Sequence, residues 1–259
     1  MSIRLNKAMS MLGICSRRDA DKYISNKSVY VNNILINNLG EKVNNGDIIT
    51  VNGVKYKFID KFKTKVWIYN KPAGLVTTHR DEKNRPTVFD SISDLIGQRV
   101  ISVGRLDLNS EGLLLLTNDG EFSRYAESPS TGWERHYRVR FFGNINDDIV
   151  NKTANGITID GIKYSPIKII DISDNKGLNK WCTCILKEGK NREIRRIFNH
   201  FGLQVNKLIR TKYGPYELGD LKVGSIREVN DRRINKLVNK NNIKDKHFKH
   251  NKLKTNDKI

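Results

Sequence analysis

The sequence predicts an α+β fold with two domains, and three observations support this expectation. Two short helical patterns followed by three strand patterns occupy the first 60 residues, which indicates a small ααβββ unit. Beyond it, strand and helix patterns alternate irregularly, which favours a mixed, largely antiparallel β-sheet flanked by helices. A chain of 259 residues also exceeds the usual size of a single domain.

The N-terminal unit, expected at residues 1–60, opens with two helices. Residues 4–12 have a helical pattern, and Ser16 with Asp19 forms a capping signal for a second helix. An Asn32-Asn33 turn joins the first two of three strand patterns, which cover residues 29–31, 34–36 and 48–51. Residues 57–65 carry four lysines and no glycine or proline, and we expect them to form a charged linker.

The second domain, expected at residues 61–230, contains the longer patterns. Strands are predicted at residues 66–69, 113–117, 136–142 and 181–186, and helices at residues 121–127 and 192–201. The apolar run at 113–117 predicts a buried strand, and Gly202 ends the last helix.

Two of these elements have a basic face. In the strand 136–142, alternation places Tyr137, Val139 and Phe141 towards the core, and His136, Arg138 and Arg140 on the other face. The helix 192–201 is expected to bury its apolar side, with four polar residues on the opposite side: Arg192, Arg195, Arg196 and Asn199.

The charge of the chain indicates a polyanionic partner. Lys and Arg number 47 against 28 Asp and Glu, which gives a net charge of +19. Nucleic acid is the partner that this excess favours. A membrane is a weaker candidate, since the longest apolar run, of about five residues, is far too short for a span. No signal-peptide pattern opens the sequence, so we expect a cytoplasmic protein. Residues 231–259 hold ten Lys or Arg against three Asp with little apolar periodicity, and are expected to form a disordered basic tail.

Metal and nucleotide motifs are not found. Cys15, Cys182 and Cys184 lack the second ligand pair of a zinc site, which favours buried reduced thiols, and the five His residues show no metal-ligand spacing. Gly189-Lys190 lacks the first glycine of a P-loop, and the sequence around Ser110 lacks the flanking glycines of a nucleophile elbow.

The most informative stretch is VGRLDLNSEGLLLLTNDG, residues 103–120, where Arg105 and Asp107 directly precede the buried strand. Taken alone, an aspartate in such a loop is more often a turn residue than a nucleophile. However, the stretch resembles the catalytic motif of the RsuA/RluB family of rRNA pseudouridine synthases. Four other segments of the chain stand in that family's order: KPAGLVTT, HYRVR, LKEGKNREIRRIFNHFGL and VNKLIRTKYGPYELGDLKVGSIREV. The N-terminal unit resembles an S4 RNA-binding domain in three segments: RLNKAMSMLGICSRRDADKYI, VYVNNILI and GDIITVNG.

The resemblance implies roles for the site residues. It makes Asp107 the nucleophile, which attacks the ribose C1′ or removes a proton from C2′, and Arg195 the cation that keeps this aspartate ionised. Tyr137 corresponds to the tyrosine that lies against the flipped uracil, although its periodicity alone indicates core packing. Arg105 would occupy the space that the extruded nucleotide leaves in the RNA. No cofactor is implied.

The remaining basic residues are expected to bind the RNA backbone. In the S4-like unit these are Arg4, Lys7, Arg17, Arg18 and Lys22, although they could equally form an ordinary solvated face. In the second domain they are Arg138, Arg140, Lys190, Arg192 and Arg196.

The sequence therefore predicts a pseudouridine synthase that acts on ribosomal RNA as a monomer without cofactor. The resemblance is strongest to the large-subunit branch, so 23S rRNA in an assembling large subunit is the expected partner. A sibling specificity for small-subunit rRNA stays open. A rival from another class is a non-catalytic ribosome-binding or assembly protein, which the joint presence of Asp107, Tyr137 and Arg195 disfavours.

Overall fold

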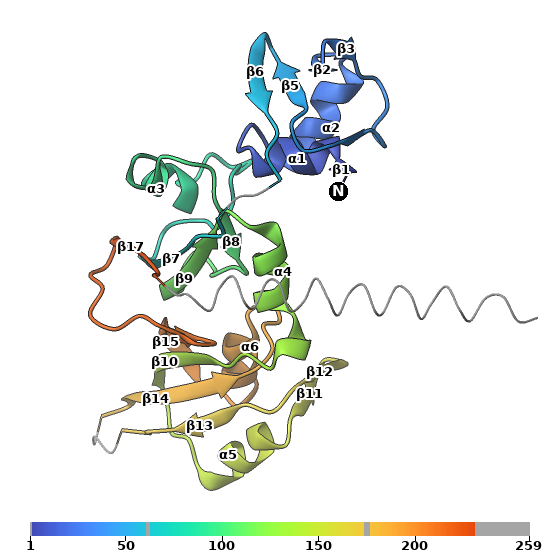
Figure 1. Ribbon diagram of the computed structural model, residues 1–259. Helices are drawn as coiled ribbons and strands as arrows, with labels where there is room; N and C mark the ends of the chain where they lie inside the picture. The colour runs from blue at the N-terminus through green and yellow to red at the C-terminus, as the bar shows by residue number, and fades with distance from the viewer. Residues whose placement is uncertain (1, 61–62, 174–176, 231–259) are drawn as a thin grey trace, which may run out of the picture. The chain divides into compact units, whose positions relative to one another are not determined.

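The computed structural model describes residues 2–60, 63–173 and 177–230, and the basic tail expected at 231–259 lies outside these ranges. The chain divides into two compact units (Figure 1). The first comprises the residues up to Thr64 together with Gly97–Val100, and the second comprises Lys65–Ile96 and the chain from Ile101 onward. The chain thus passes from the first unit to the second, returns for four residues, and passes back.

The two predicted helices of the first unit are confirmed as α1 (Leu5–Met11) and α2 (Arg17–Ser25). Ser16 caps α2: its Oγ accepts from the Asp19 amide at 3.1 Å and donates to the Asp19 carboxylate at 2.6 Å. This reciprocal pair satisfies one of the free amides at the helix start, so α2 begins where the sequence signal places it.

The strands of the first unit number more than predicted. The three expected strands form a sheet with a fourth, in the order β3-β2-β5-β6, and β1 pairs separately with β4. Asn32 and Asn33, both at positive φ, turn the chain between β2 and β3. The bounds are β1 (Ile3–Arg4), β2 (Val29–Val31), β3 (Ile34–Leu35), β4 (Lys42–Val43), β5 (Ile48–Val51) and β6 (Val54–Lys57).

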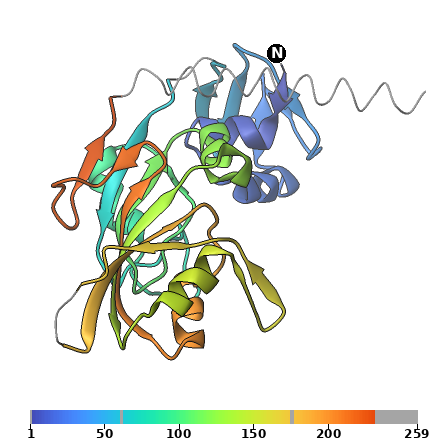
Figure 2. The same cartoon turned by 90° about the horizontal axis from the view of Figure 1, so that it is seen from below.

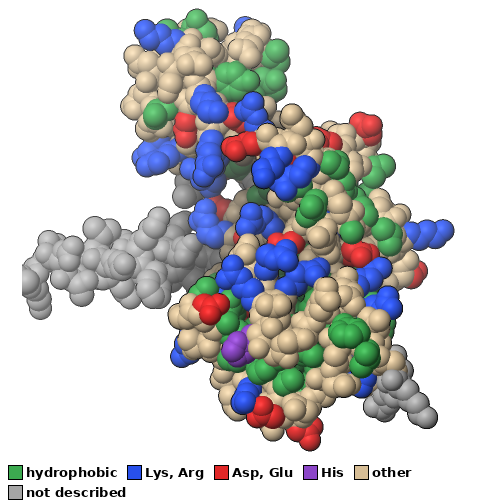
Figure 3. All heavy atoms as spheres, turned by 180° about the vertical axis from the view of Figure 1, so that it is seen from behind, with side chains coloured by type: hydrophobic (Ala, Val, Ile, Leu, Met, Phe, Trp, Pro, Cys, Tyr) green, Lys and Arg blue, Asp and Glu red, His purple; other side chains and the backbone are tan. Residues whose placement is uncertain are grey.

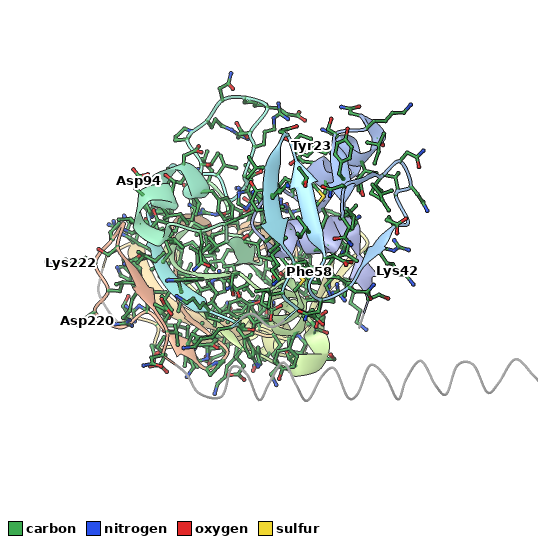
Figure 4. All side chains as sticks on the ribbon, turned by 45° about the horizontal axis from the view of Figure 1, so that its top comes forward. Tyr23, Lys42, Phe58, Asp94, Asp220 and Lys222 are labelled. Carbon is green, nitrogen blue, oxygen red and sulfur yellow. The ribbon has the colours of Figure 1, made fainter. Side chains whose placement is uncertain are left out.

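The predicted start of the linker, at residue 57, is wrong. Lys57 is the last residue of β6, and Phe58, labelled in Figure 4, is fully buried in the core of the first unit with Leu5, Met9 and Ile49. The burial of Phe58 could not be predicted from the lysine-rich sequence around it, because a single buried aromatic residue produces no periodic pattern.

The second unit is built on a nine-stranded sheet, which confirms the α+β class. The main path has the order β13-β14-β10-β15-β9-β7-β17, with β16 paired to β15 and β8 to β9. Every pair is antiparallel except β15–β9. The bounds are β7 (Val66–Lys71), β8 (Ile101–Val103), β9 (Glu111–Thr117), β10 (Arg135–Phe142), β13 (Lys168–Ile170), β14 (Asn179–Leu186), β15 (Gln204–Tyr213), β16 (Tyr216–Glu217) and β17 (Ile226–Glu228); β11 (Ile157–Ile159) and β12 (Ile162–Tyr164) form a separate hairpin.

Helices flank this sheet, two of them predicted and two not. The predicted pair are α4 (Gly120–Glu127), capped by the Asp119 side chain, and α6 (Glu193–His200), which Figure 2 shows beside β15. The helix α6 begins one residue later than expected, since Arg192 is in the left-handed conformation with φ 51°. The sequence patterns missed α3 (Val88–Ile96) and α5 (Asp147–Ala154), whose first turns are capped by short polar side chains.

The alternation of β10 is confirmed. Tyr137, Val139 and Phe141 are buried, whereas Arg138 and Arg140 on the other face are exposed. The Phe141 ring contacts Phe198 of α6, with ring centroids 5.5 Å apart. The same face of β10 therefore anchors α6 and presents Tyr137, and this sets where the tyrosine lies relative to the helix.

Candidate active site

The Asp107 loop, residues 104–110, connects β8 to β9 and is held from the neighbouring strand. Lys71, the last residue of β7, is fully buried, and its Nζ donates to the carbonyl oxygens of Pro72 at 2.9 Å, Asp107 at 3.2 Å, Leu108 at 3.4 Å and Ser110 at 2.9 Å. Burial lowers the pKa of Lys71 to about 8, against the opposing effect of the Asp107 and Glu111 carboxylates. Its ammonium group thus lies close enough to the Asp107 carboxylate for the two charges to interact.

The segment after β7 holds the same loop at further points. The Thr77 hydroxyl donates to the Leu106 carbonyl at 2.8 Å, and the Gly74 amide donates to the Leu108 carbonyl at 2.8 Å. Within the loop, the Ser110 amide donates to the Asp107 carbonyl at 3.0 Å. The backbone of Asp107 is therefore fixed on both sides, while its side chain stays half-buried at the surface of a pocket.

This pocket, of about 650 Å³, lies entirely within the second unit. It is lined by the Asp107 loop, by β10 and β15, and by the segment that leads into α6. Five of the predicted site residues line it together: Arg105, Asp107, Tyr137, Lys190 and Arg192. The mixed polar and apolar wall, with one carboxylate on a rigid loop, suits a polar planar ring presented to a fixed acid.

Arg195 lies near this loop but does not form the expected ion pair. Its guanidinium donates to the carbonyl oxygens of Asn109 at 3.0 Å and Val205 at 2.9 Å. Among the described residues, no ion pair within 4.0 Å joins Arg195 to Asp107. Burial and the nearby Arg192 lower the pKa of Arg195, and the Asp107 carboxylate partly opposes them. Arg195 thus positions the Asp107 loop and interacts with its charge without direct contact.

A second hollow, of about 300 Å³, lies between α6 and the start of β15. Its walls include Arg192, Arg195, Arg196 and Asn199, the four polar residues that the helical pattern placed together. Arg192 lines both this groove and the larger pocket. The groove has the charge and size to take a phosphate group of a nucleic acid that also reaches the pocket.

The other basic residues are placed elsewhere. Arg138 and Arg140 lie on the face of β10 opposite to Tyr137, and the Arg138 guanidinium lies over the Trp181 ring, 5.4 Å from its centroid. The sequence grouped them with Lys190 and Arg192, but the structure does not bring the two sets together. Arg4, Lys7, Arg17, Arg18 and Lys22 belong to the first unit, where Arg4, Arg17, Arg18 and Lys22 are exposed. Figure 3 shows Lys and Arg side chains, in blue, on one face of the protein.

Sequence reasoning missed two buried arginines in the pocket wall. Arg210 of β15 is 2% exposed; its Nε donates to the Leu113 carbonyl at 2.7 Å, and its Nη2 has no hydrogen-bond partner in the described part of the chain. Arg135 of β10 donates to the Tyr213 hydroxyl at 3.0 Å and to the Lys187 carbonyl at 3.1 Å. A sequence signal existed only for Arg135, because it occupies an inward position of the alternating strand β10, where an unpaired charge would be costly. The irregular burial pattern of β15 gives no such signal for Arg210.

The three cysteines are buried and free, as expected, and Cys182 and Cys184 face the same way with their Sγ atoms 3.9 Å apart. Burial raises the pKa of Cys15 to about 11. Over the residues that the structure describes, no group of three or more His, Cys, Asp or Glu side chains is arranged to hold a metal ion. No helix in this part of the chain is long and apolar enough to cross a membrane.

Comparison with known proteins assigns the family. Residues 65–200 match the model for RNA pseudouridylate synthases, and residues 3–49 match the S4 domain. The chain belongs to the RNA pseudouridylate synthase family. The Asp107 loop, α6 and most of the pocket lining lie within the matched segment of this synthase. The family resemblance inferred from the motifs is confirmed.

Relatives of the synthase cover most of its length. A protein of Rickettsia typhi named as an uncharacterized RNA pseudouridine synthase is 46% identical over 235 residues, 91% of this chain and 95% of that protein. Ribosomal large subunit pseudouridine synthase B of Buchnera aphidicola is 41% identical over 252 residues, covering 95% of this chain and all of that protein. The same-named protein of Pseudomonas aeruginosa is 38% identical over 240 residues, 90% of this chain and 61% of that protein.

A solved structure has the same fold. A crystal structure of a pseudouridylate synthase superposes with a TM-score of 0.62 and 26% sequence identity, covering 91% of this chain and 99% of that one.

Proposed function

We propose that this synthase isomerises one uridine of large-subunit ribosomal RNA to pseudouridine, with Asp107 as the nucleophile. The observation that carries the proposal is the placement of Asp107 on a loop fixed by Lys71, at the wall of the same pocket as Tyr137. The names of the relatives from Buchnera aphidicola and Pseudomonas aeruginosa support the large subunit as the source of the substrate. We further propose that the enzyme acts as a monomer in the cytoplasm, where ribosomes are assembled.

The reaction breaks the bond between uracil N1 and ribose C1′ and forms a bond between C5 and C1′. The proton that leaves C5 balances the one that N1 gains, so substrate and product are isomers and no electrons are exchanged. Asp107 either attacks C1′ to form a covalent intermediate or removes the C2′ proton to form a glycal. Both routes require an ionised carboxylate. The charges of Lys71 and Arg195 lie near enough to interact with it.

The surrounding residues take complementary roles in this proposal. Tyr137 lies against the uracil in the pocket and assists the transfer of the C5 proton, and exposed Arg105 occupies the space left by the extruded nucleotide. Phosphate groups on either side of the uridine bind in the α6 groove, at Arg192 and Arg196, and at Lys190. Arg4, Lys7, Arg17 and Arg18 of the S4 unit, with Arg138 and Arg140, contact other phosphate groups of the RNA backbone.

Mapping of pseudouridines tests the substrate. Both ribosomal RNAs are isolated from cells with and without the gene, and modified sites are detected by carbodiimide treatment and primer extension. We expect one large-subunit pseudouridine to disappear without the gene and to return when it is restored. Loss of a small-subunit site instead would assign the enzyme to the sibling specificity, and unchanged maps would favour the assembly-protein alternative.

Substitution of Asp107 tests the nucleophile. Asp107→Asn keeps the shape of the side chain but removes its charge, so pseudouridine formation should be abolished while RNA affinity stays within a few fold. The control is Asp94→Asn, at an exposed position of α3 outside the pocket, which should leave product formation unchanged. A near wild-type rate for the Asp107 variant would rule out this residue as the nucleophile.

A further inference from the structure

Glu193, the first residue of α6, is a buried acid in the wall of the pocket. It is 4% exposed, and its Oε2 accepts from the Lys190 amide at 2.9 Å. Its Oε1 receives no hydrogen bond from a donor in the described part of the chain. The carboxyl group of Glu188 lies close enough to interact with that of Glu193. Neither acid has a role in the proposed chemistry.

Glu188 is already equipped with donors for an ionised carboxylate. Its Oε1 accepts from the Ser165 amide at 2.6 Å, and its Oε2 accepts from the Lys190 ammonium at 2.7 Å. Two ionised carboxylates this near to one another in a buried site would repel, and one proton between them removes the repulsion. Glu193 is the acid better suited to keep that proton, because it accepts a hydrogen bond only from a backbone amide, whereas Glu188 also accepts one from an ammonium group.

The electrostatic environment agrees with this arrangement. Burial, together with the Glu188 carboxylate, raises the pKa of Glu193 to about 8. Burial also acts to raise the pKa of Glu188, but hydrogen bonds from Lys190 and Ser165 outweigh it and leave that pKa lowered. Glu193 is thus neutral and Glu188 charged over the neutral pH range.

The pair ties down the segment 187–192, which joins β14 to α6 and carries two of the basic residues at the pocket. Lys190 is held through its amide by Glu193 and through its ammonium group by Glu188 and the Lys163 carbonyl, at 2.6 Å. Arg192 follows in a left-handed conformation that non-glycine residues seldom adopt, so surrounding contacts must maintain it.

The charges around the pocket are nearly balanced, so ionisation of Glu193 would change the repulsion that an RNA phosphate meets there. Glu193 shares the wall with charged groups of the Asp107 loop, α4, β10, β15 and the segment 187–192: Arg105, Asp107, Glu127, Arg135, Arg210, Glu188, Lys190 and Arg192. The described lining therefore holds five basic side chains and four carboxyls, Glu193 included. Ionised Glu193 would repel both Glu188 and an entering RNA phosphate.

We propose that Glu193 is a positioning residue for RNA binding: a single proton shared with Glu188 holds the segment 187–192 in place and so keeps Lys190 and Arg192 at the pocket wall, within reach of the RNA backbone. The proposal rests on the proposed function only in taking ribosomal RNA as the ligand. Loss of the proton at alkaline pH should then loosen the segment and weaken RNA binding.

Direct titration of the carboxyls tests the shared proton without any RNA. The full chain is labelled with ¹³C at the glutamate carboxyl carbons, and its NMR spectrum is followed from pH 4 to pH 9.5. We expect one glutamate resonance to titrate near pH 8, the value to which its surroundings raise it, and to be missing from Glu193→Gln. If every glutamate resonance titrates at its ordinary value, about 4.3, there is no shared proton and the proposal is overturned.

Binding of a 23S rRNA transcript at constant ionic strength tests the consequence. From pH 7 to pH 9, the dissociation constant of the wild type should rise by about three- to tenfold, since the pair becomes two like charges. Glu193→Gln keeps a donor for Glu188 and an acceptor for Lys190 but cannot ionise, so it should bind like the wild type at pH 7 and stay constant to pH 9. Glu193→Leu removes the hydrogen bonds and should bind weakly at both pH values.

Comparison of these variants separates the proposal from other effects. Lys71, whose pKa is also about 8, is present in all three proteins, so its titration cannot explain a difference between them. A Glu193→Gln variant that loses affinity with pH as the wild type does would overturn the proposal. Failure of the wild type to bind the transcript at pH 7 would instead contradict the proposed rRNA substrate, and the NMR titration would still decide whether the proton is shared.

Discussion

At the scale of single residues, Lys71 shows how one buried cation can fix a loop that the sheet itself does not hold. Its ammonium group bonds four carbonyl oxygens, three of them in the Asp107 loop. Backbone carbonyls outside a β-ladder must find donors when they are buried, and here a single side chain supplies them. The position of the Asp107 carboxylate therefore depends on a residue 36 positions earlier in the sequence.

Removal of this cation should cost both stability and turnover. Lys71→Met leaves buried carbonyls without a donor, so the free energy of unfolding should fall by about 2–3 kcal/mol. The turnover number should fall as well, because Asp107 loses its fixed backbone, whereas RNA affinity should change little. Denaturant unfolding and single-turnover assays measure the two effects. As a control, Lys65→Met removes two surface contacts of an ammonium group, the ion pair with Glu228 and the approach to the Trp67 ring, and should cost less than about 1 kcal/mol.

Substitutions of two neighbouring arginines of α6 should have different effects, one on the rate of the chemical step and the other on RNA affinity. Arg195 bonds the Asn109 carbonyl of the Asp107 loop, whereas Arg196 is exposed in the phosphate-sized groove. Arg195→Met should therefore lower the rate of the chemical step at saturating RNA by at least about tenfold, which corresponds to 1.4 kcal/mol of lost positioning. Arg196→Met should raise the dissociation constant and leave that rate unchanged. Equal losses of affinity alone in both variants would show that Arg195 is merely a phosphate contact.

The residue level also marks the limit of what the sequence could predict. Asp107, Tyr137 and Arg105 meet at one pocket as the motifs indicated. The family resemblance implies a direct Asp107–Arg195 pair, but the Arg195 guanidinium donates to the carbonyl oxygens of Asn109 and Val205 instead. Such main-chain partners carry no sequence signal, and the role of Lys71 was hidden for the same reason.

At the scale of elements, the parallel contact between β9 and β15 joins the Asp107 side of the sheet to the side that carries Tyr137. Ile209 and Arg210 pair with Glu111 and Gly112, the two residues that follow the Asp107 loop. A Cβ atom at Gly112 would lie 2.9 Å from the Arg210 amide nitrogen and closer still to its carbonyl oxygen, and the φ of Gly112 is +94°. The two halves of the pocket therefore meet at a position that only glycine can occupy.

Substitution of this glycine should separate the halves. Gly112→Ala forces two backbones apart, so we expect the free energy of unfolding to fall by more than about 3 kcal/mol. Gly161→Ala is the matched control, with φ +74° but no atom within 4 Å of the added Cβ, and strain alone should cost about 1–2 kcal/mol. Thermal unfolding followed by circular dichroism compares them. Equal losses would mean that the close approach is relieved by a small backbone shift.

Elements were predictable where one periodicity dominates. The strand β10 and the helix α6 follow their apolar patterns closely, and Ser16 marks the start of α2. The strand β15 was missed because its burial is irregular and bulges interrupt its pairing with β10. Helices α3 and α5 bury two residues each, against three in α4 and four in α6, so their apolar patterns do not stand out from those of the surrounding loops.

At the scale of the whole molecule, the excess of positive charge should govern the salt dependence of RNA binding. Residues 231–259 contribute ten Lys or Arg, and each phosphate that they neutralise adds about 0.7–0.9 to the slope of log affinity against log salt. Deletion of this tail should therefore make the slope shallower by several units without changing the rate at saturating RNA. A tail of the same length with glutamine at the ten basic positions should behave like the deletion, and an unchanged slope in both would show that the tail makes no contact.

The brief return of the chain to the first unit at Gly97–Val100 makes the synthase difficult to divide. In that segment Val100 is 4% exposed, and the Arg99 side chain lies beside Gly13. A fragment that starts at Lys65 would expose these residues to water although no bond within the second unit had been cut. A protease that cleaves near residue 61 should likewise leave two pieces that travel together through a sizing column until denaturant is added. Shuffling of the S4 unit between relatives would have to carry four residues from the middle of the catalytic unit along with it.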